Sequence, residues 1–199
     1  MNKKNSLLLL LVGIVLLSWC PNTLVAQGRT TRSEGPGREV YTGNIIYFGG
    51  VRGTITTTFT LTINSYTPPQ QVDQFLNILR SGGQDELMRA IGNDKRGTIQ
   101  IGAQVGRDIN AVWESQDEEE GRKINVLFER WLGFGELRRG ARSVDYPFTF
   151  VEIYLDDRGR GEGSMIPAAR IRAKRGQTIE IENFGIYPAR LNNIRRRGR

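Results

Sequence analysis

The chain has 199 residues, no histidine, a single cysteine and a formal net charge of +7. Without histidine it cannot form a Ser-His-Asp or Cys-His catalytic arrangement, and it offers no imidazole as a general base or zinc ligand. Its one cysteine, Cys20, lies in a segment expected to be removed, so the folded domain must be stabilised without a disulfide. The sequence therefore predicts no metal and no cofactor.

Residues 1–26 have the composition of a secretory signal peptide. Lys3 and Lys4 supply the positive charge, and Leu7 to Leu17 form an apolar run. That run is shorter than the roughly 20 residues needed to span a bilayer. The sequence therefore predicts a soluble periplasmic or secreted protein with no membrane span after signal cleavage. A membrane anchor and lipidation at Cys20 are the alternatives.

The rest of the chain alternates strand patterns with turn signals. In Thr54–Ile63 the odd positions are mostly apolar and the even positions are threonine, which predicts a strand with one buried and one solvated face. A strand over 40–48 precedes it, and the glycines between the two favour a hairpin. Turns are expected at 116–121 and 156–163. Further strands are expected at 99–105, 109–115, 124–128, 146–155, 165–173, 178–184 and 189–194.

Residues 68–91 interrupt this pattern with a two-helix insert. Val72, Phe75, Leu76 and Leu79 recur at helical spacing before the sequence Ser81-Gly82-Gly83, and a second apolar stripe ends at Ile91. We expect the insert to cover one open end of the β domain; a lid over a pocket is the alternative.

The predicted fold class is mainly β, a single antiparallel β-sandwich or barrel that includes the helical insert. The β-rich domain is expected over 39–194, after a flexible lead-in at 27–38 and before a basic tail at 195–199. The sequence does not decide between sandwich and barrel.

The densest group of aromatic and arginine residues lies between 130 and 150. Such residues can hold an anionic or amphipathic ligand through stacking, cation–π contacts and bidentate hydrogen bonds. The alternative is an ordinary aromatic core with a basic connecting loop. The candidate ligand-binding residues are Arg130, Trp131, Arg138, Arg139, Arg142 and Tyr146.

These observations favour a non-enzymatic binding module for a small ligand, glycan, lipid or envelope partner, and they give no indication of nucleic-acid binding. One alternative is a hydrolase that uses a pair of carboxylates. The other is a structural envelope protein with no small ligand. The acids considered for the hydrolase are Glu129, Glu136, Asp145 and Glu152.

Overall fold

The computed structural model describes residues 37–50, 53–117, 121–130, 142–174, 179–185 and 187–197. The predicted signal peptide at 1–26 and nearly all of the predicted lead-in at 27–38 lie outside these residues. In the described part of the chain, no helix has the length and apolar character required to cross a membrane.

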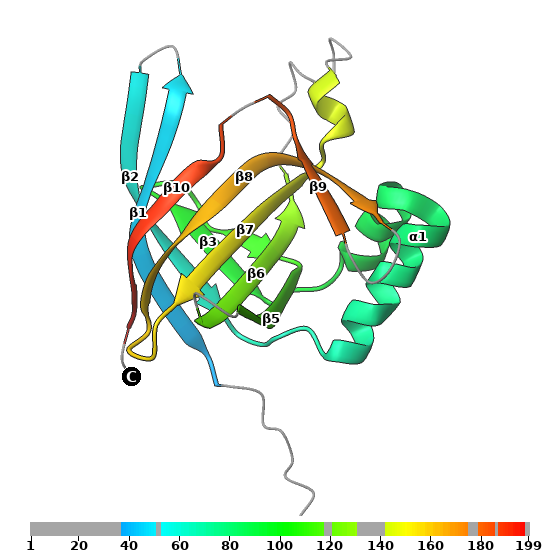
Figure 1. Ribbon diagram of the computed structural model, residues 1–199, viewed down its shortest axis with the longest axis horizontal. Coiled ribbons are helices and arrows are strands. Elements are labelled where there is room, and N and C mark those ends of the chain that lie inside the picture. Colours follow the sequence, from blue (N-terminus) through cyan, green and yellow to red (C-terminus); the bar gives the residue numbers. More distant parts are fainter. Residues whose placement is uncertain are drawn as a thin grey trace, which may run out of the picture. The chain divides into compact units, whose positions relative to one another are not determined.

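The described residues form one antiparallel sheet of ten strands and one long α-helix (Figure 1). Hydrogen-bonded neighbours follow the order β4-β3-β2-β1-β10-β8-β7-β6-β5, and β9 pairs with β8 beside this path. The strands are β1 (Glu39–Gly50), β2 (Gly53–Ile63), β3 (Gly97–Ile101), β4 (Arg107–Ile109), β5 (Ala111–Asp117), β6 (Gly121–Glu129), β7 (Phe148–Leu155), β8 (Arg160–Ala173), β9 (Ile179–Asn183) and β10 (Ala189–Arg196).

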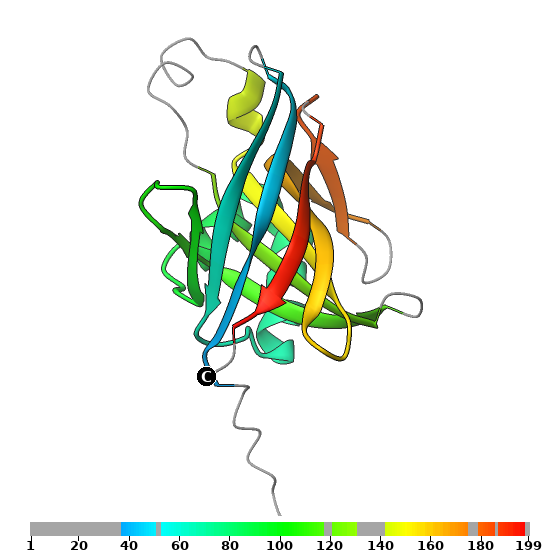
Figure 2. The ribbon, with the colours of Figure 1, turned by 90° about the vertical axis from the view of Figure 1, so that its left-hand side faces the viewer.

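The two ends of this strand order are joined at Asn110. Strands β4 and β5 stand at opposite ends of the order, yet they follow each other in the chain with only Asn110 between them. The Ile109 carbonyl accepts a hydrogen bond from the Arg96 amide at 2.9 Å, while the Asn110 amide donates to the Leu127 carbonyl at 3.1 Å. The sheet therefore curls into a nearly closed barrel (Figure 2), which confirms the barrel prediction and removes the sandwich alternative.

Alternating side chains fill the barrel interior. In β2, Phe59, Leu61 and Ile63 are buried, as the alternation with threonine predicted. Neighbouring strands contribute Ile, Val, Leu, Phe and Met side chains to the same cluster. The interior is thus a packed core over most of its length.

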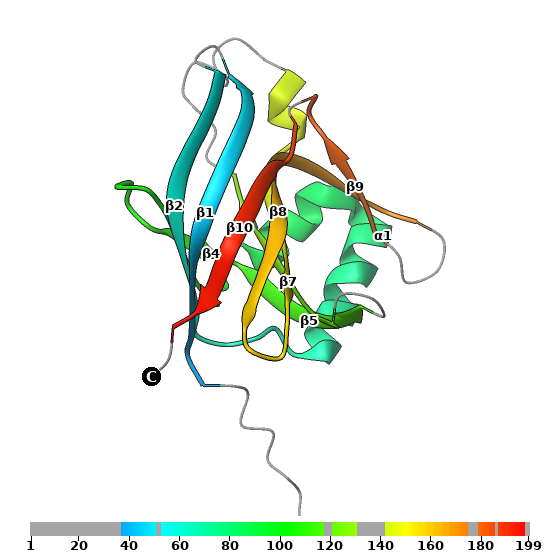
Figure 3. The ribbon, with the colours of Figure 1, turned by 60° about the vertical axis from the view of Figure 1, so that its left-hand side comes forward.

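Helix α1 (Pro69–Ile91) packs against the outside of the barrel (Figures 1 and 3). Strands β6 and β7 are apolar on both faces, so their outer side chains also need cover: Leu127, Phe148 and Phe150 are buried against the helix side of the sheet. The helix supplies Leu79, Leu87 and Ile91 to this second cluster. The expectation that the insert covers an open end of the barrel is therefore wrong.

The insert is one kinked helix, so the prediction of two separate helices is not confirmed. The kink lies at Gly83, whose φ of 75° and ψ of −168° are non-helical. That backbone region is accessible essentially to glycine alone. The sequence thus placed the break in the helical pattern correctly, but the helix continues through this break as a kink.

Several strand boundaries differ from those predicted. Strand β3 ends at Ile101 rather than at 105, and β8 begins at Arg160, inside the expected turn at 156–163. That turn is short because the Asp156 carboxylate accepts hydrogen bonds from the Arg158 and Arg160 amides at 2.9 and 2.8 Å.

Another difference concerns the predicted basic tail. Strand β10 continues to Arg196, whose amide donates to the Gly159 carbonyl at 2.9 Å, and the Arg197 amide donates to the Val40 carbonyl at 2.7 Å. Backbone pairing therefore incorporates the first three residues of the stretch predicted to be a tail at 195–199.

Candidate functional site at the open end of the barrel

One end of the barrel is closed by a polar network around Glu39. This side chain is 2% exposed. Its carboxylate accepts hydrogen bonds from the Tyr66 hydroxyl at 2.6 Å and the Tyr41 hydroxyl at 2.8 Å. It also forms ion pairs with Arg122 at 3.1 Å and Arg196 at 2.8 Å. A buried carboxylate needs such partners to remain charged.

The network joins the ends of several strands. Glu39 and Tyr41 begin β1, Arg122 lies near the start of β6 and Arg196 ends β10. Burial opposes ionisation of Glu39, yet the two tyrosine hydrogen bonds and the two arginine charges lower the pKa of its carboxyl below the ordinary value. Because its groups satisfy one another inside the barrel, this end is a structural closure.

The network also predicts a loss of stability in alkali. Burial, followed by the hydrogen bond to Glu39, raises the pKa of Tyr41 from 10.0 to about 12. A group with a raised pKa in the folded state contributes stability below its unfolded pKa and loses it as the pH rises through the folded value. The free energy of unfolding should therefore fall between about pH 10 and about pH 12.

Urea denaturation at a series of pH values measures this effect, with Tyr41→Phe as the comparison. The variant lacks the titrating hydroxyl, so its stability should fall less steeply in that range than the stability of the unmodified protein. Parallel slopes for the two proteins would contradict the assignment to Tyr41.

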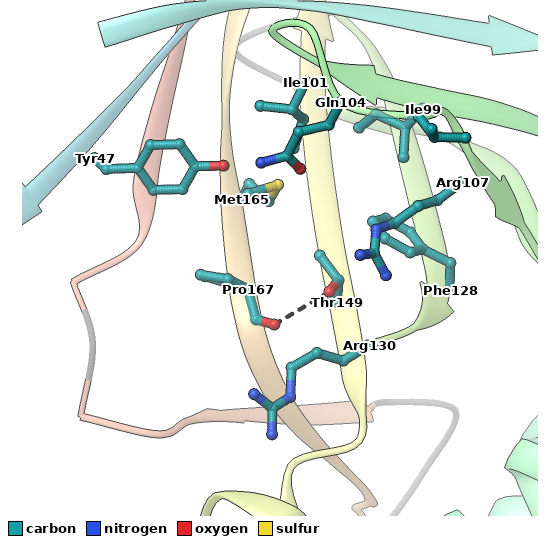
Figure 4. A pocket seen from close by; sticks show the side chains of 11 residues that line it. Tyr47, Ile99, Ile101, Gln104, Arg107, Phe128, Arg130, Thr149, Met165 and Pro167 are labelled. Atoms are coloured by element: carbon teal, nitrogen blue, oxygen red, sulfur yellow. Dashed lines mark hydrogen bonds between the residues drawn. The ribbon is translucent and has the colours of Figure 1, made fainter. Parts of the chain in front are cut away.

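The opposite end of the barrel contains a cavity of about 250 Å³ (Figure 4). Its walls come from the strand ends and connections at this end. The lining residues are Tyr47, Ile99, Ile101, Gln104, Val105, Arg107, Phe128, Arg130, Thr149, Met165 and Pro167.

The cavity combines an apolar floor with polar groups near its mouth. Ile99, Phe128 and Met165 are buried members of the interior core and form the floor. The Tyr47 hydroxyl and the Arg107 guanidinium group approach the cavity from opposite sides (Figure 4). Burial raises the pKa of the Tyr47 hydroxyl above its ordinary value. This hydroxyl is therefore a hydrogen-bond donor well beyond neutral pH. This layout suits a ligand with an apolar body and a polar end.

Arg130 is held in place by the segment that leads into β7. Its amide donates to the Pro147 carbonyl at 2.7 Å, and its Nε donates to the Tyr146 carbonyl at 3.0 Å. Nearby, the Thr149 hydroxyl donates to the Pro167 carbonyl at 3.1 Å and joins β7 to β8 (Figure 4). These bonds fix the direction in which Arg130 leaves the end of β6 and place it in the cavity wall.

The structure separates the two predicted ligand-binding residues whose side chains it describes. Arg130 lines the cavity. The ring of Tyr146 is buried elsewhere: its hydroxyl donates to Glu182 at 2.6 Å, and its ring lies 4.9 Å from that of Phe184. The Tyr146 carbonyl accepts a hydrogen bond from Arg130 at 3.0 Å.

The side chains of the other four predicted residues lie outside the described part of the chain. Arg142 begins the short 3-10 helix η1 (Arg142–Asp145), but its side chain lies outside the described part of the chain. Trp131, Arg138 and Arg139 also lie outside the described residues. Their contribution to ligand binding stays a prediction.

Sequence reasoning missed Arg107, Gln104 and Tyr47 at this site. A signal was available, because consecutive antiparallel strands alternate in direction. If the sheet closes, three predicted strand termini must meet: the end of 40–48, the start of 109–115 and the end of 124–128. Closure at Asn110 was not predicted, however, and without it the sequence gives no reason to place Arg107 beside Arg130.

The acids considered for hydrolysis do not line this cavity where the structure describes them. Glu129 and Asp145 are exposed, and Glu152 forms an ion pair with Lys123 at 2.6 Å. Glu136 lies outside the described residues. Within the described ranges there is likewise no cluster of three acids or other metal-ligating side chains.

Comparisons with known proteins provide no independent indication of function. No family model matches the chain, and searches of curated proteins and of solved structures found no match to it.

Proposed function

We propose that the protein is a non-enzymatic binding module that holds a small amphipathic anion in the open end of its barrel. The observation that carries this proposal is the apolar floor of Ile99, Phe128 and Met165 in a cavity that Arg107 and Arg130 also line. Apolar surface removed from water provides affinity, while the arginines select the charge and orientation of the ligand.

The size of the cavity limits the ligand. Its volume of about 250 Å³ lies just below the roughly 300–1,000 Å³ typical of pockets for drug-sized molecules. A short-chain or single-ring acid fits this description. Its anionic group would face the guanidinium groups, which bind carboxylates and phosphates through paired N–H donors.

Binding is favoured over carboxylate-dependent hydrolysis by the chemistry of the lining. Glycoside hydrolysis requires two carboxyl groups facing one another across the scissile bond. The described residues that line the cavity include no aspartate or glutamate. A structural protein without a ligand would have no need for an open cavity that combines an apolar floor with cationic side chains.

Titration calorimetry with octanoate tests the proposal. The unmodified protein should bind octanoate, and Arg130→Gln and Arg107→Gln should each weaken binding by about tenfold or more, as expected for the loss of a charge-assisted hydrogen bond. Octanol, which has no negative charge, should bind equally to all three proteins. The matched control is Arg158→Gln, an exposed arginine in the turn at the closed end.

The outcomes separate the proposal from a general charge effect. Equal loss of octanoate binding in Arg158→Gln would show that net charge, and not the cavity, attracts the anion. Unchanged affinity in Arg107→Gln and Arg130→Gln, with both variants folded by circular dichroism, would overturn the proposed site.

A further inference from the structure

The large apolar side chains that are exposed in the described part of the chain all lie toward the open end of the barrel. They are Phe48 at 39%, Ile55 at 46%, Val105 at 90% and Tyr187 at 75% exposed. Phe48 lies near the end of β1 and Ile55 near the start of β2, while Val105 lies between β3 and β4 and Tyr187 just before β10. We refer to these four residues as the apolar rim.

The apolar rim adjoins the cavity. Val105 is one of the lining residues, and Ile55 stands directly opposite the lining residue Tyr47 in the β1–β2 ladder. On the outside of the barrel, Phe48 and Tyr187 border a second, open depression of about 500 Å³ together with Arg190. Figures 1 and 3 show the β1–β2 tip and the chain entering β10 at this same end.

We propose that the apolar rim docks the open end of the barrel on an anionic lipid surface. The four side chains would enter the interfacial layer, and Arg107 and Arg190 would face the headgroup phosphates. The inference rests on the proposed function, because a small amphipathic anion partitions into such a surface and the docked cavity would open toward it.

The chemistry of the rim favours lipid over a protein partner. Exposed apolar groups concentrated at one place mark a protein or membrane interaction site. Here they lie on three separate chain segments with Gln104 and arginines beside them. A fluid interface can accommodate such separated side chains, whereas a protein interface needs a closely complementary surface.

The tyrosine and arginine side chains at the open end also favour an anionic lipid surface. Tyrosine is enriched where a membrane meets water, because its ring is apolar and its hydroxyl is solvated. Arginine side chains near an anionic leaflet are attracted to its surface charge and form paired hydrogen bonds with phosphate. Val105 and Tyr187, the most exposed apolar residues of the rim, each lie in a segment that also carries an arginine, Arg107 or Arg190.

Co-sedimentation with vesicles tests this docking. The purified protein should sediment with vesicles of phosphatidylcholine and phosphatidylglycerol and much less with phosphatidylcholine alone. The double variant Ile55→Ser with Val105→Ser should bind the anionic vesicles about tenfold more weakly, since two apolar side chains no longer leave water. Phe48→Ser with Tyr187→Ser should also weaken vesicle binding, whereas Arg158→Gln at the closed end should not.

Octanoate binding without vesicles keeps the docking distinct from the proposed function. Phe48→Ser with Tyr187→Ser should retain octanoate affinity within about threefold, because neither residue lines the cavity and its floor and arginines are unchanged. Protein that sediments with anionic vesicles but does not bind octanoate would preserve the docking and remove the proposed ligand site.

Three results would overturn the docking itself. The first is failure of the unmodified protein to sediment with anionic vesicles, and the second is equal sedimentation of the rim variants. The third is a dimer in light scattering that the rim substitutions convert to a monomer, without vesicle binding by either form. That result would assign the apolar rim to contact between two copies of the chain.

Discussion

Replacing Glu39 with alanine is expected to lower the free energy of unfolding by about 3 kcal/mol or more. The carboxylate is buried and accepts hydrogen bonds from two tyrosines while it pairs with Arg122 and Arg196. Its removal would leave the Tyr41 and Tyr66 hydroxyls and part of the Arg122 guanidinium group without their acceptor inside the barrel. Urea denaturation followed by circular dichroism measures the change.

The matched control is Glu86→Ala on helix α1. Glu86 pairs with Arg89 at 2.8 Å, but both side chains are well exposed. Such an exposed pair contributes less than about 1 kcal/mol. Similar losses in the two variants would mean that the Glu39 network does not stabilise the closed end.

A second variant, Glu39→Gln, separates charge from hydrogen bonding. The amide oxygen can still accept one of the tyrosine hydroxyls, while the attraction to Arg122 and Arg196 is lost. We expect a smaller loss of stability than in Glu39→Ala. A glutamine variant as stable as the unmodified protein would show that the ionic contribution is negligible at this site.

The individual strands were the part of the fold most readily predicted from the sequence. The alternation of threonine with Phe59, Leu61 and Ile63 specifies which face of β2 is buried, and the structure confirms that face. Closure could not be predicted in the same way. It depends on Asn110, where the chain passes from β4, which hydrogen-bonds on the β3 side, to β5, which hydrogen-bonds to β6. Local periodicity contains no information about such long-range pairing.

The helical insert was likewise predicted as a local element, but its long-range packing was not. The spacing of Val72, Phe75 and Leu79 correctly predicts an apolar helical face, and Phe75 and Leu79 pack in the same cluster as Ile171 on the outer sheet. The sequence does not say which surface receives that face. The clue lay in β6 and β7, where consecutive apolar residues require cover on both sides of the sheet.

The candidate site was predicted only in part, because a cavity at a barrel mouth is assembled from distant strand ends. Arg130 was identified by its neighbourhood in sequence, and the structure places it in the cavity wall. Tyr146 lies near it along the chain, but its ring packs with Phe184 and its hydroxyl donates to Glu182. Proximity in sequence therefore did not predict a shared surface.

Two glycines in β8, Gly161 and Gly163, are expected to matter as much for the stability of the fold as the Glu39 network. Replacing Gly163 with alanine would place a Cβ atom against the Glu152 carbonyl oxygen of β7, inside van der Waals contact, and Gly161 faces the Tyr154 carbonyl in the same way. Both obstacles are backbone atoms of a paired strand, so neither can move without disturbing the β7–β8 ladder. Each substitution should therefore lower the free energy of unfolding by about 3 kcal/mol or more.

Gly106→Ala provides the control for these substitutions. A Cβ atom at Gly106 would lie 3.8 Å from the Ile99 carbonyl oxygen, an ordinary contact. Its effect on stability should stay within about 1 kcal/mol in either direction. Urea denaturation of the three variants makes the comparison, and a Gly163→Ala protein as stable as Gly106→Ala would contradict the close approach of β7 to β8. Because this pairing holds Glu152, Ser164 and the lining residue Met165 in register, loss of the ladder should also weaken octanoate binding at the open end.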